Sequence, residues 1–237
     1  MSAVLRTEGL TRILEGDVSE TLVEVINLEI EQGEFVAIMG PSGSGKSSLL
    51  YLLGLLDMPT AGKLWLNGND TEGLSEDELA NIRLAQLGFV FQFHFLLAEF
   101  SALDNVLLPV RKLGRLPENE ARARGLELLG ALGLADHAHK LPSQMSGGQR
   151  QRVAVARALA NDPLINFADA PTGALDTKSS ENLRMIFKDL SQRQRRTIVV
   201  VTHDPNFAKA ADRVLFLVDG KLQPPERAAD LLAISIR

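Results

Sequence analysis

The segment GPSGSGKS, residues 40–47, constrains this chain more than any other feature. It follows the short apolar run FVAIM (residues 35–39), which is typical of a buried strand, and it leads into SSLLYLLGLL (residues 47–56), which has the length and composition of a helix. A glycine-rich turn between a strand and a helix directs backbone N–H groups and the positive end of the helix dipole toward one point. The sequence therefore predicts a phosphate-binding loop rather than a Gly/Ser turn before a buried helix.

The side chains of this loop predict a nucleotide site with a metal ion. Lys46 places a cation at the β- and γ-phosphates, and the Ser47 hydroxyl is a ligand for Mg²⁺. We expect these loop residues to contact the nucleotide: Gly40, Pro41, Ser42, Gly43, Ser44, Gly45, Lys46, Ser47 and Ser48.

Apolar runs along the chain predict the fold class. The runs are FVAIM, PLINFA (163–168), TIVVVT (197–202) and RVLFLV (213–218), and all four are apolar on both faces, as central parallel strands are. Helix-length segments such as SSENLRMIFKDLSQRQ (179–194) lie between them. The alternation of strands and helices indicates an α/β fold with a parallel sheet covered by helices.

The middle of the chain predicts a separate helical part. It has no comparable strand run, and ENEARARGLELLGALGL (118–134) is its clearest amphipathic segment. We expect one domain over residues 1–237, made of a catalytic core at 1–92 and 159–222, an inserted helical subdomain at 93–158 and a C-terminal tail at 223–237.

The strand PLINFA is followed by a carboxylate, Asp169. Such a residue more often caps the next helix or turn, but beside a phosphate loop it is the usual partner for Mg²⁺. Asn166 lies inside the same strand, so it must find a hydrogen-bond partner or face an edge of the sheet.

A second anion site is predicted in MSGGQRQRVAVARALA, residues 145–160. Ser146, Gly147 and Gly148 open a helix there, which gives either a bound anion or a plain serine cap with a glycine turn. This segment lies in the predicted helical subdomain, far along the chain from the phosphate loop. One nucleotide can hardly contact both within one chain.

Together these motifs resemble the ATP-binding-cassette ATPases, over roughly residues 3–222. The resemblance implies an α/β fold with a P-loop (RecA-like) parallel-sheet core, an N-terminal antiparallel β part and an inserted α-helical subdomain. It also implies ATP and Mg²⁺ as cofactors. In that family the signature motif, here Ser146, Gly147, Gly148 and Gln149, contacts the nucleotide of a partner subunit, so the resemblance implies a homodimer formed with ATP.

The resemblance assigns three further site residues. Gln92 in GFVFQFHF matches the glutamine that contacts Mg²⁺ and the attacking water and that faces the membrane subunit. Asp176 matches the D-loop, and His203 in VVVTHD matches the histidine that contacts the γ-phosphate. The implied metal ligands are Ser47, Gln92 and Asp169.

Within the family, the stretches LLGLLDMPTAGKL, GFVFQFHFLLAEFSALDNVLLP and ADAPTGALD are most similar to the ATPase subunits of lipoprotein-releasing and macrolide-export transporters. This similarity implies integral membrane transporter subunits as partners and a peripheral location on the cytoplasmic face of the inner membrane. An alternative is a nucleotide-gated envelope scaffold of the cell-division type. A third class, cassette proteins that act on DNA or ribosomes, usually carries paired cassettes, a coiled-coil insert or basic arms, which this sequence lacks.

The chain departs from the family at Ala170, where a Glu that orients or deprotonates the attacking water is expected. A positioned general base contributes about 10²- to 10⁴-fold in rate, so we expect ATP binding to persist and hydrolysis to be impaired. Two interpretations remain open, a naturally slow ATPase and a sequence in which Glu was replaced. We favour replacement, because the residues around Ala170 keep the active pattern. A second departure is TRILEGDVSE (residues 11–20), which has no aromatic residue to stack on adenine.

Composition excludes several classes of protein. The net charge of −5 argues against a nucleic-acid partner, because such binding needs a basic surface. The absence of cysteine excludes disulfides, thiolate catalysis and cysteine-bound zinc. No apolar run reaches the roughly 18 residues that a membrane-spanning helix needs.

Overall fold

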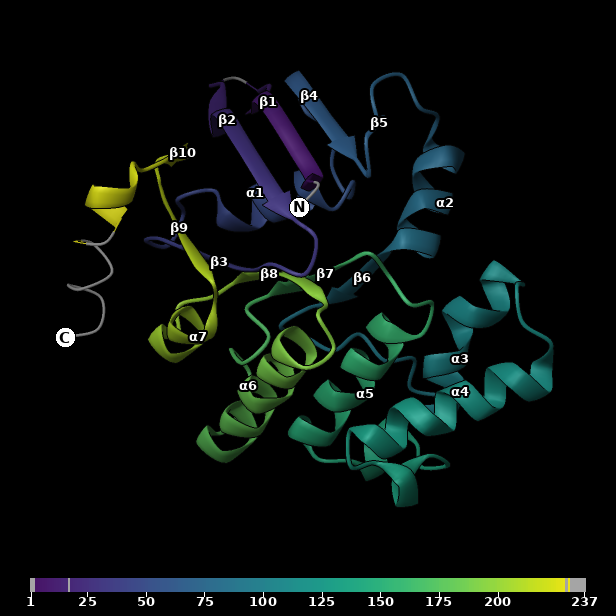
Figure 1. The fold of residues 1–237 in the computed structure, drawn as a ribbon. Helices are drawn as coiled ribbons and strands as arrows, with labels where there is room; N and C mark the ends of the chain where they lie inside the picture. Colours follow the sequence, from purple (N-terminus) through teal and green to yellow (C-terminus); the bar gives the residue numbers. More distant parts are fainter. Residues whose placement is uncertain (1–2, 17, 229, 231–237) are drawn as a thin grey trace.

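The computed structural model describes residues 3–16, 18–228 and 230 and contains two β-sheets (Figure 1). The smaller sheet is antiparallel and has the strand order β2-β1-β4-β5. Its strands are β1 (Ala3–Leu14), β2 (Glu20–Glu31), β4 (Ala61–Leu66) and β5 (Asn69–Asp70). This sheet is the antiparallel part that the resemblance implied.

The larger sheet has the strand order β10-β9-β3-β8-β7-β6. All its neighbouring strands are parallel except for the edge pair of β10 and β9. The strands are β3 (Phe35–Met39), β6 (Leu87–Val90), β7 (Ile165–Asp169), β8 (Thr197–Val201), β9 (Arg213–Val218) and β10 (Lys221–Leu222). The predicted parallel-sheet core is therefore confirmed.

Both faces of the larger sheet are covered, and the alternation of β3 shows how. Phe35 and Ala37 pack with side chains of the helices below the sheet in Figure 1, whereas Val36 and Ile38 pack with α1 and with the antiparallel sheet. Since successive side chains of a strand point to opposite faces, a strand buried on both sides must be apolar at every position. This requirement explains FVAIM and TIVVV, whose residues are all buried.

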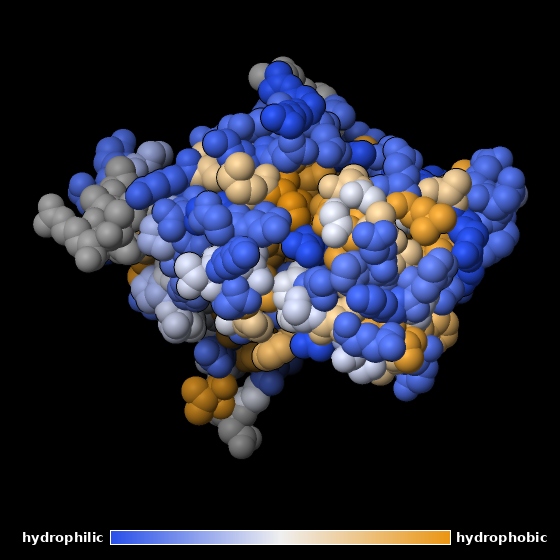
Figure 2. Space-filling model, turned by 90° about the horizontal axis from the view of Figure 1, so that it is seen from below, coloured by the Kyte–Doolittle hydropathy of each residue, from blue (hydrophilic) through white to orange (hydrophobic). Residues whose placement is uncertain are grey.

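Between β1 and β10 the described residues form seven α-helices and two short 3₁₀ helices, and residues 225–228 are helical as well. The helices between β1 and β10 are α1 (Lys46–Leu53), α2 (Glu76–Gln86), α3 (Ala102–Leu113), α4 (Glu118–Ala131), α5 (Gly147–Leu159), α6 (Thr177–Gln192), α7 (Pro205–Ala210), η1 (Ala135–His137) and η2 (Pro142–Gln144). Seen from below, the molecule is mostly polar with scattered apolar patches (Figure 2). None of the described helices combines the length and the apolar character that crossing a bilayer requires.

Two strand expectations need correction. The run RVLFLV is β9, but its side chains are only partly buried, because β9 lies beside the two-residue edge strand β10 rather than in the centre of the sheet. β7 begins at Ile165 rather than at residue 163, and it includes Asp169. The division into a core and a helical subdomain stays a prediction, although all described elements within residues 93–158 are helices.

The expectation for Asn166 was wrong. This residue lies in β7, between β6 and β8, and is 4% exposed, yet neither its amide nitrogen nor its amide oxygen has a hydrogen-bond partner in the structure. Its oxygen occupies the space beside Gly88 of β6, where a Cβ atom would lie 2.8 Å away. On folding, the Asn166 side chain therefore loses its hydrogen bonds to water and gains none within the protein, which is unfavourable.

We predict that Asn166→Leu stabilises the chain. Leucine has the same branching as asparagine and no polar atoms, so the substitution removes a desolvation cost of about 1–3 kcal/mol. Urea unfolding without nucleotide should give a larger free energy of unfolding with an unchanged m-value. A destabilised variant would contradict the prediction and would indicate an ordered water on the amide.

Candidate nucleotide-binding site

The loop between β3 and α1 requires glycine at two positions. Gly40 has φ +149° and Gly45 has φ +89°, in the region that favours glycine. A Cβ atom on Gly40 would collide with the carbonyl oxygen of Leu217, and one on Gly45 with the carbonyl oxygen of Leu22. The loop backbone is therefore held tightly between β9 and β2, in a shape that only glycine permits.

Helix α1 begins without a side-chain cap. Its N-cap is Gly45, which supplies no side-chain acceptor, whereas α2, α5 and α6 are capped by Ser75, Ser146 and Asp176. The first N–H groups of a helix have no acceptor within the helix. Phosphate oxygens are suitable acceptors for these groups and interact favourably with the helix dipole.

Lys46 lies inside the loop and is 6% exposed. Its ammonium group donates to the carbonyl oxygen of Pro41 and, at 3.5 Å, to the hydroxyl of Ser44, which are both neutral acceptors. Burial lowers the pKa of Lys46, and the charge of Asp169 partly opposes this effect. A cation in this position is only partly compensated by the protein, which suits a polyphosphate ligand.

Two of the three residues expected to bind the metal ion, Ser47 and Asp169, are hydrogen-bonded to each other. The Ser47 hydroxyl donates to Asp169 Oδ1 at 3.0 Å, and the Tyr51 hydroxyl donates to Asp169 Oδ2 at 3.0 Å. Mg²⁺ prefers hydroxyl, carboxylate and phosphate oxygens, so Ser47 and Asp169 fit this ion. Burial, followed by the charge of Asp169 and the hydrogen bond to it, raises the pKa of Tyr51, so the phenol is a proton donor at neutral pH.

Sequence reasoning missed Tyr51. It lies four residues after Ser47 on α1, and residues at this spacing share a helix face. The spacing was visible in the sequence and placed both hydroxyls on one side of the helix.

Ala170 follows β7 in a strained turn. Its φ is +42°, its N–H donates to the Val201 carbonyl at 2.9 Å, and its carbonyl accepts from the Gly173 N–H at 2.9 Å. Gln92 packs against the same turn. Its Nε2 atom lies 2.9 Å from the position that a Cβ atom on Gly173 would occupy. The structure thus brings Gln92 and the Ala170 turn together.

Two further acidic residues, Asp176 and Asp204, have structural roles as helix caps. Asp176 caps α6 by accepting from the Ser179 N–H at 2.9 Å, and Asp204 caps α7 by accepting from the Asn206 N–H at 2.8 Å. His203 is solvent-exposed; partial burial of its ring and the charge of Lys46 lower its pKa, while Asp169 opposes them. His203 therefore lies within the electrostatic influence of the phosphate loop and Asp169.

The second predicted anion site is the start of α5. Ser146 Oγ accepts from the Gln149 N–H at 3.2 Å, and Gln149 Oε1 accepts from the Ser146 N–H at 2.8 Å, so the two residues form a capping box. A Cβ atom on Gly148 would collide with Ser179 in the first turn of α6. His137 contacts Gln149 Nε2 through its Nε2 at 2.9 Å.

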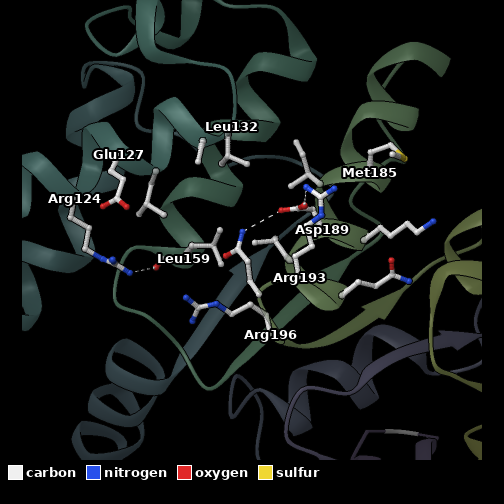
Figure 3. Close-up of a pocket in the computed structure, with 15 residues that line it drawn as sticks. Arg124, Glu127, Leu132, Leu159, Met185, Asp189, Arg193 and Arg196 are labelled. Carbon is white, nitrogen blue, oxygen red and sulfur yellow. Dashed lines mark hydrogen bonds and ion pairs between the residues drawn. The ribbon is translucent and has the colours of Figure 1, made fainter.

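The helices that carry the two predicted anion sites, α1 and α5, contact different elements of the fold. Helix α1 contacts β2, β7 and β8, whereas α5 packs against α3, α4, α6 and β6. A cleft of about 950 Å³ between α4, α5 and α6 contains none of the expected site residues (Figure 3). Some of its charged residues have partners within the chain: Arg124 donates to the Ala160 carbonyl, and Arg193 pairs with Asp189.

Comparison with known proteins places the chain in a family. The family described as "ABC transporter" matches residues 23–173. The lipoprotein-releasing system ATP-binding protein LolD 1 of Chlorobium chlorochromatii is 47% identical to this chain, and the match spans 93% of this chain and 91% of that protein. The macrolide export ATP-binding/permease protein MacB of Marinobacter nauticus is also 47% identical over 92% of this chain, which spans only 34% of that longer protein.

The solved structures agree with the sequence comparison. The ATP-binding cassette MJ0796, a protein of Methanocaldococcus jannaschii, has been solved as a dimer in a post-hydrolysis state with ADP and Pi. It superimposes with a TM-score of 0.86 and 43% identity, covering 93% of this chain and 97% of that chain. The chain therefore belongs to the ABC transporter family and is one of its ATPases.

Proposed function

We propose that this chain is the ATP-binding subunit of an export-type ABC transporter, similar to those that release lipoproteins or export macrolides, and that ATP drives it by closing a homodimer. The observation that carries the proposal is the uncapped start of α1, beside which lie Lys46 and the Ser47–Asp169 pair. Helix α5, which Ser146 caps, contacts other elements of the fold. Two copies facing each other can complete each nucleotide site with the start of α5 from the partner. The dimeric MJ0796 cassette supports this arrangement.

Each predicted site residue has a role in this proposal. The loop from Gly40 to Ser48 and Lys46 bind the phosphates, and Ser47, Asp169 and Gln92 hold Mg²⁺, which supplies positive charge to the phosphate oxygens when bound. Ser146, Gly147, Gly148, Gln149 and Asp176 contribute to the site across the dimer. His203 and Gln92 orient water and the γ-phosphate. 

We also propose that hydrolysis by this chain is slow. Ala170 offers no base, and Asp176 and Asp204 are engaged as helix caps. Asp169 is engaged through both oxygens, with Ser47 and Tyr51. The nucleotide contacts remain, so an ATP-bound dimer should persist.

The surface near Gln92 suits a membrane subunit. Phe93 and Phe95 follow Gln92 and are 64% and 62% exposed, and a mainly apolar groove beside them is lined by Phe89, Phe91 and Pro109. We propose that an integral membrane subunit docks here, which would hold the chain at the cytoplasmic face of the inner membrane. Two relatives, an ATP-binding protein of a lipoprotein-releasing system and an ATP-binding/permease protein, support this partner.

A nucleotide-gated envelope scaffold is the second candidate, and Ala170 is the observation that favours it, because a scaffold needs little turnover. The adjacent gene discriminates between the two. A membrane protein with four spans and a large extracytoplasmic domain supports export, whereas a regulator of cell-wall hydrolases supports scaffolding.

We predict that ATP with Mg²⁺ dimerises the chain, that ADP does not, and that Ser146→Arg abolishes the dimer. The arginine would occupy the space where the γ-phosphate of the partner's nucleotide meets α5, but the α1 site of the same chain is intact, so single-site binding should persist. Sedimentation velocity with each nucleotide measures the dimer.

The matched control is Ser75→Arg. Ser75 is exposed and forms the same capping box at the start of α2, where its Oγ accepts from the Glu78 N–H at 3.3 Å. This variant should lose a comparable helix cap and still dimerise. A wild-type monomer at saturating ATP, or equal loss of the dimer in both variants, would refute the proposal.

A further inference from the structure

Tyr51 has an unusual position for a residue outside the nucleotide-binding loop. Its hydroxyl donates to Asp169 Oδ2 while Ser47 donates to Oδ1, both at 3.0 Å, although Asp169 lies on β7 and the two hydroxyls lie on α1. Each oxygen of the carboxylate therefore has one donor from the same helix. Two such bonds fix both the position and the plane of the carboxylate.

The ring of Tyr51 is itself held by its surroundings. It meets Phe91 edge to face, with ring centroids 6.5 Å apart and an interplanar angle of 70°. Phe91 stacks on Phe89 at 6.0 Å, and its carbonyl accepts from Gln151 Nε2 at 2.8 Å. Because the ring rests on an anchored neighbour, the hydroxyl is placed before any ligand binds.

The two donors differ in what happens when Mg²⁺ arrives. The proposed function assigns Ser47 and Asp169 to the ion, so their mutual hydrogen bond would be given up if both held Mg²⁺. The bond from Tyr51 to Oδ2 uses the other oxygen and can remain. Hydrogen bonds to the far side of a metal ligand orient that ligand, and their loss typically costs about 10–100-fold in metal affinity or activity.

We propose that Tyr51 is a positioning residue for the metal-binding carboxylate, and that its hydroxyl holds Asp169 so that Oδ1 faces the Ser47 hydroxyl and Mg²⁺. This role rests on the proposed nucleotide and Mg²⁺ site. The positioning role belongs to the hydroxyl of Tyr51 rather than to its ring, so replacing Tyr51 with phenylalanine separates the effect of the hydroxyl from that of the ring.

The test is Tyr51→Phe, measured with a fluorescent ADP, which the proposed function predicts does not close the dimer. For each protein, the dissociation constant is determined with saturating Mg²⁺ and again with EDTA. Comparing the ratio of the two constants between the variant and the wild type reports the change in affinity for Mg²⁺ on the protein, because the affinity of Mg²⁺ for the free nucleotide is the same in both cases. We expect Tyr51→Phe to reduce the Mg²⁺-dependent gain at least about tenfold and to leave the constant in EDTA unchanged.

Two control measurements distinguish a loss of Mg²⁺ affinity from a general effect on the folded structure. Tyr51→Phe keeps the contact with Phe91 and loses only the hydrogen bond to Asp169, so its unfolding midpoint should fall less than that of Tyr51→Leu. Tyr51→Leu should show the same loss of Mg²⁺ dependence together with a lower midpoint, since it removes the ring as well.

Each remaining outcome decides against the role of Tyr51. An unchanged Mg²⁺-dependent gain in Tyr51→Phe, or an equal loss of affinity with Mg²⁺ and with EDTA, overturns it while leaving the proposed function intact. If the wild-type chain shows no Mg²⁺ dependence, the Mg²⁺ site of the proposed function fails, and the role of Tyr51 fails with it.

Discussion

Ala170→Glu is expected to raise the single-turnover rate of ATP hydrolysis by at least about 10²-fold, because it supplies a carboxylate base at the turn beside Asp169 and Gln92. The substitution leaves the residues proposed to contact Mg²⁺ and the phosphates unchanged, so the gain should come from the chemical step. The lifetime of the ATP dimer should fall in parallel, since hydrolysis removes the γ-phosphate that bridges the two copies. Rapid mixing of a small amount of labelled ATP with excess protein measures the rate.

Ala170→Gln is the matched control for this experiment. Glutamine has the size and polarity of glutamate and experiences the same backbone strain at φ +42°, but it cannot accept a proton at neutral pH. The rate should stay within a few-fold of the Ala170 protein. If the Ala170 protein already hydrolyses ATP as fast as Ala170→Glu, another group is the base and the proposal of slow hydrolysis is wrong.

Lys46→Ala is expected to remove measurable nucleotide binding. A hydrogen bond to a charged group contributes about 1.5–3 kcal/mol, and the buried Lys46 is proposed to make one such bond to each of the β- and γ-phosphates, so losing both should raise the dissociation constant about 100-fold or more. The effect is large because no aromatic residue in residues 11–20 is available to stack on adenine, which leaves the phosphate contacts dominant. Titration with a fluorescent nucleotide measures the constant.

Lys188→Ala is the control for charge alone. Lys188 is exposed and lines the cleft between α4, α5 and α6, so its loss changes the net charge equally without touching the phosphate loop. Its affinity for nucleotide should match that of the wild type. A comparable loss of affinity in both variants would mean that the nucleotide binds away from the loop, or that charges outside the loop supply much of its attraction for the nucleotide.

The features that the sequence alone predicted are those encoded by neighbouring residues. The phosphate loop is continuous from Gly40 to Ser48, and the strands β3 and β8 read directly as apolar runs because both of their faces are buried. The start of α5 was predictable for the same reason, since Ser146 and Gln149 form their capping box within one turn. The family followed from the order of these local motifs, and the comparisons confirm it.

The weaker predictions concern residues whose surroundings come from distant segments. β6 has only four residues and gives too short a pattern to recognise, and β9 is apolar like a central strand although it lies next to an edge. Asn166 was expected to find a partner, but the space around it is set by Gly88 on the neighbouring strand.

The sequence by itself determined the phosphate loop, the parallel-sheet core, the start of α5 and the missing carboxylate at position 170, because each depends on a contiguous stretch of residues. Only the tertiary structure decided that Tyr51 donates to Asp169, 118 positions away, and that Gln92 packs against Gly173 in the turn of Ala170. Sequence patterns report which face of an element is buried, but they do not report which side chain of another element meets it. That depends on strand order, and here the order β3-β8-β7-β6 brings the ends of strands that are distant in the sequence to one edge of the sheet.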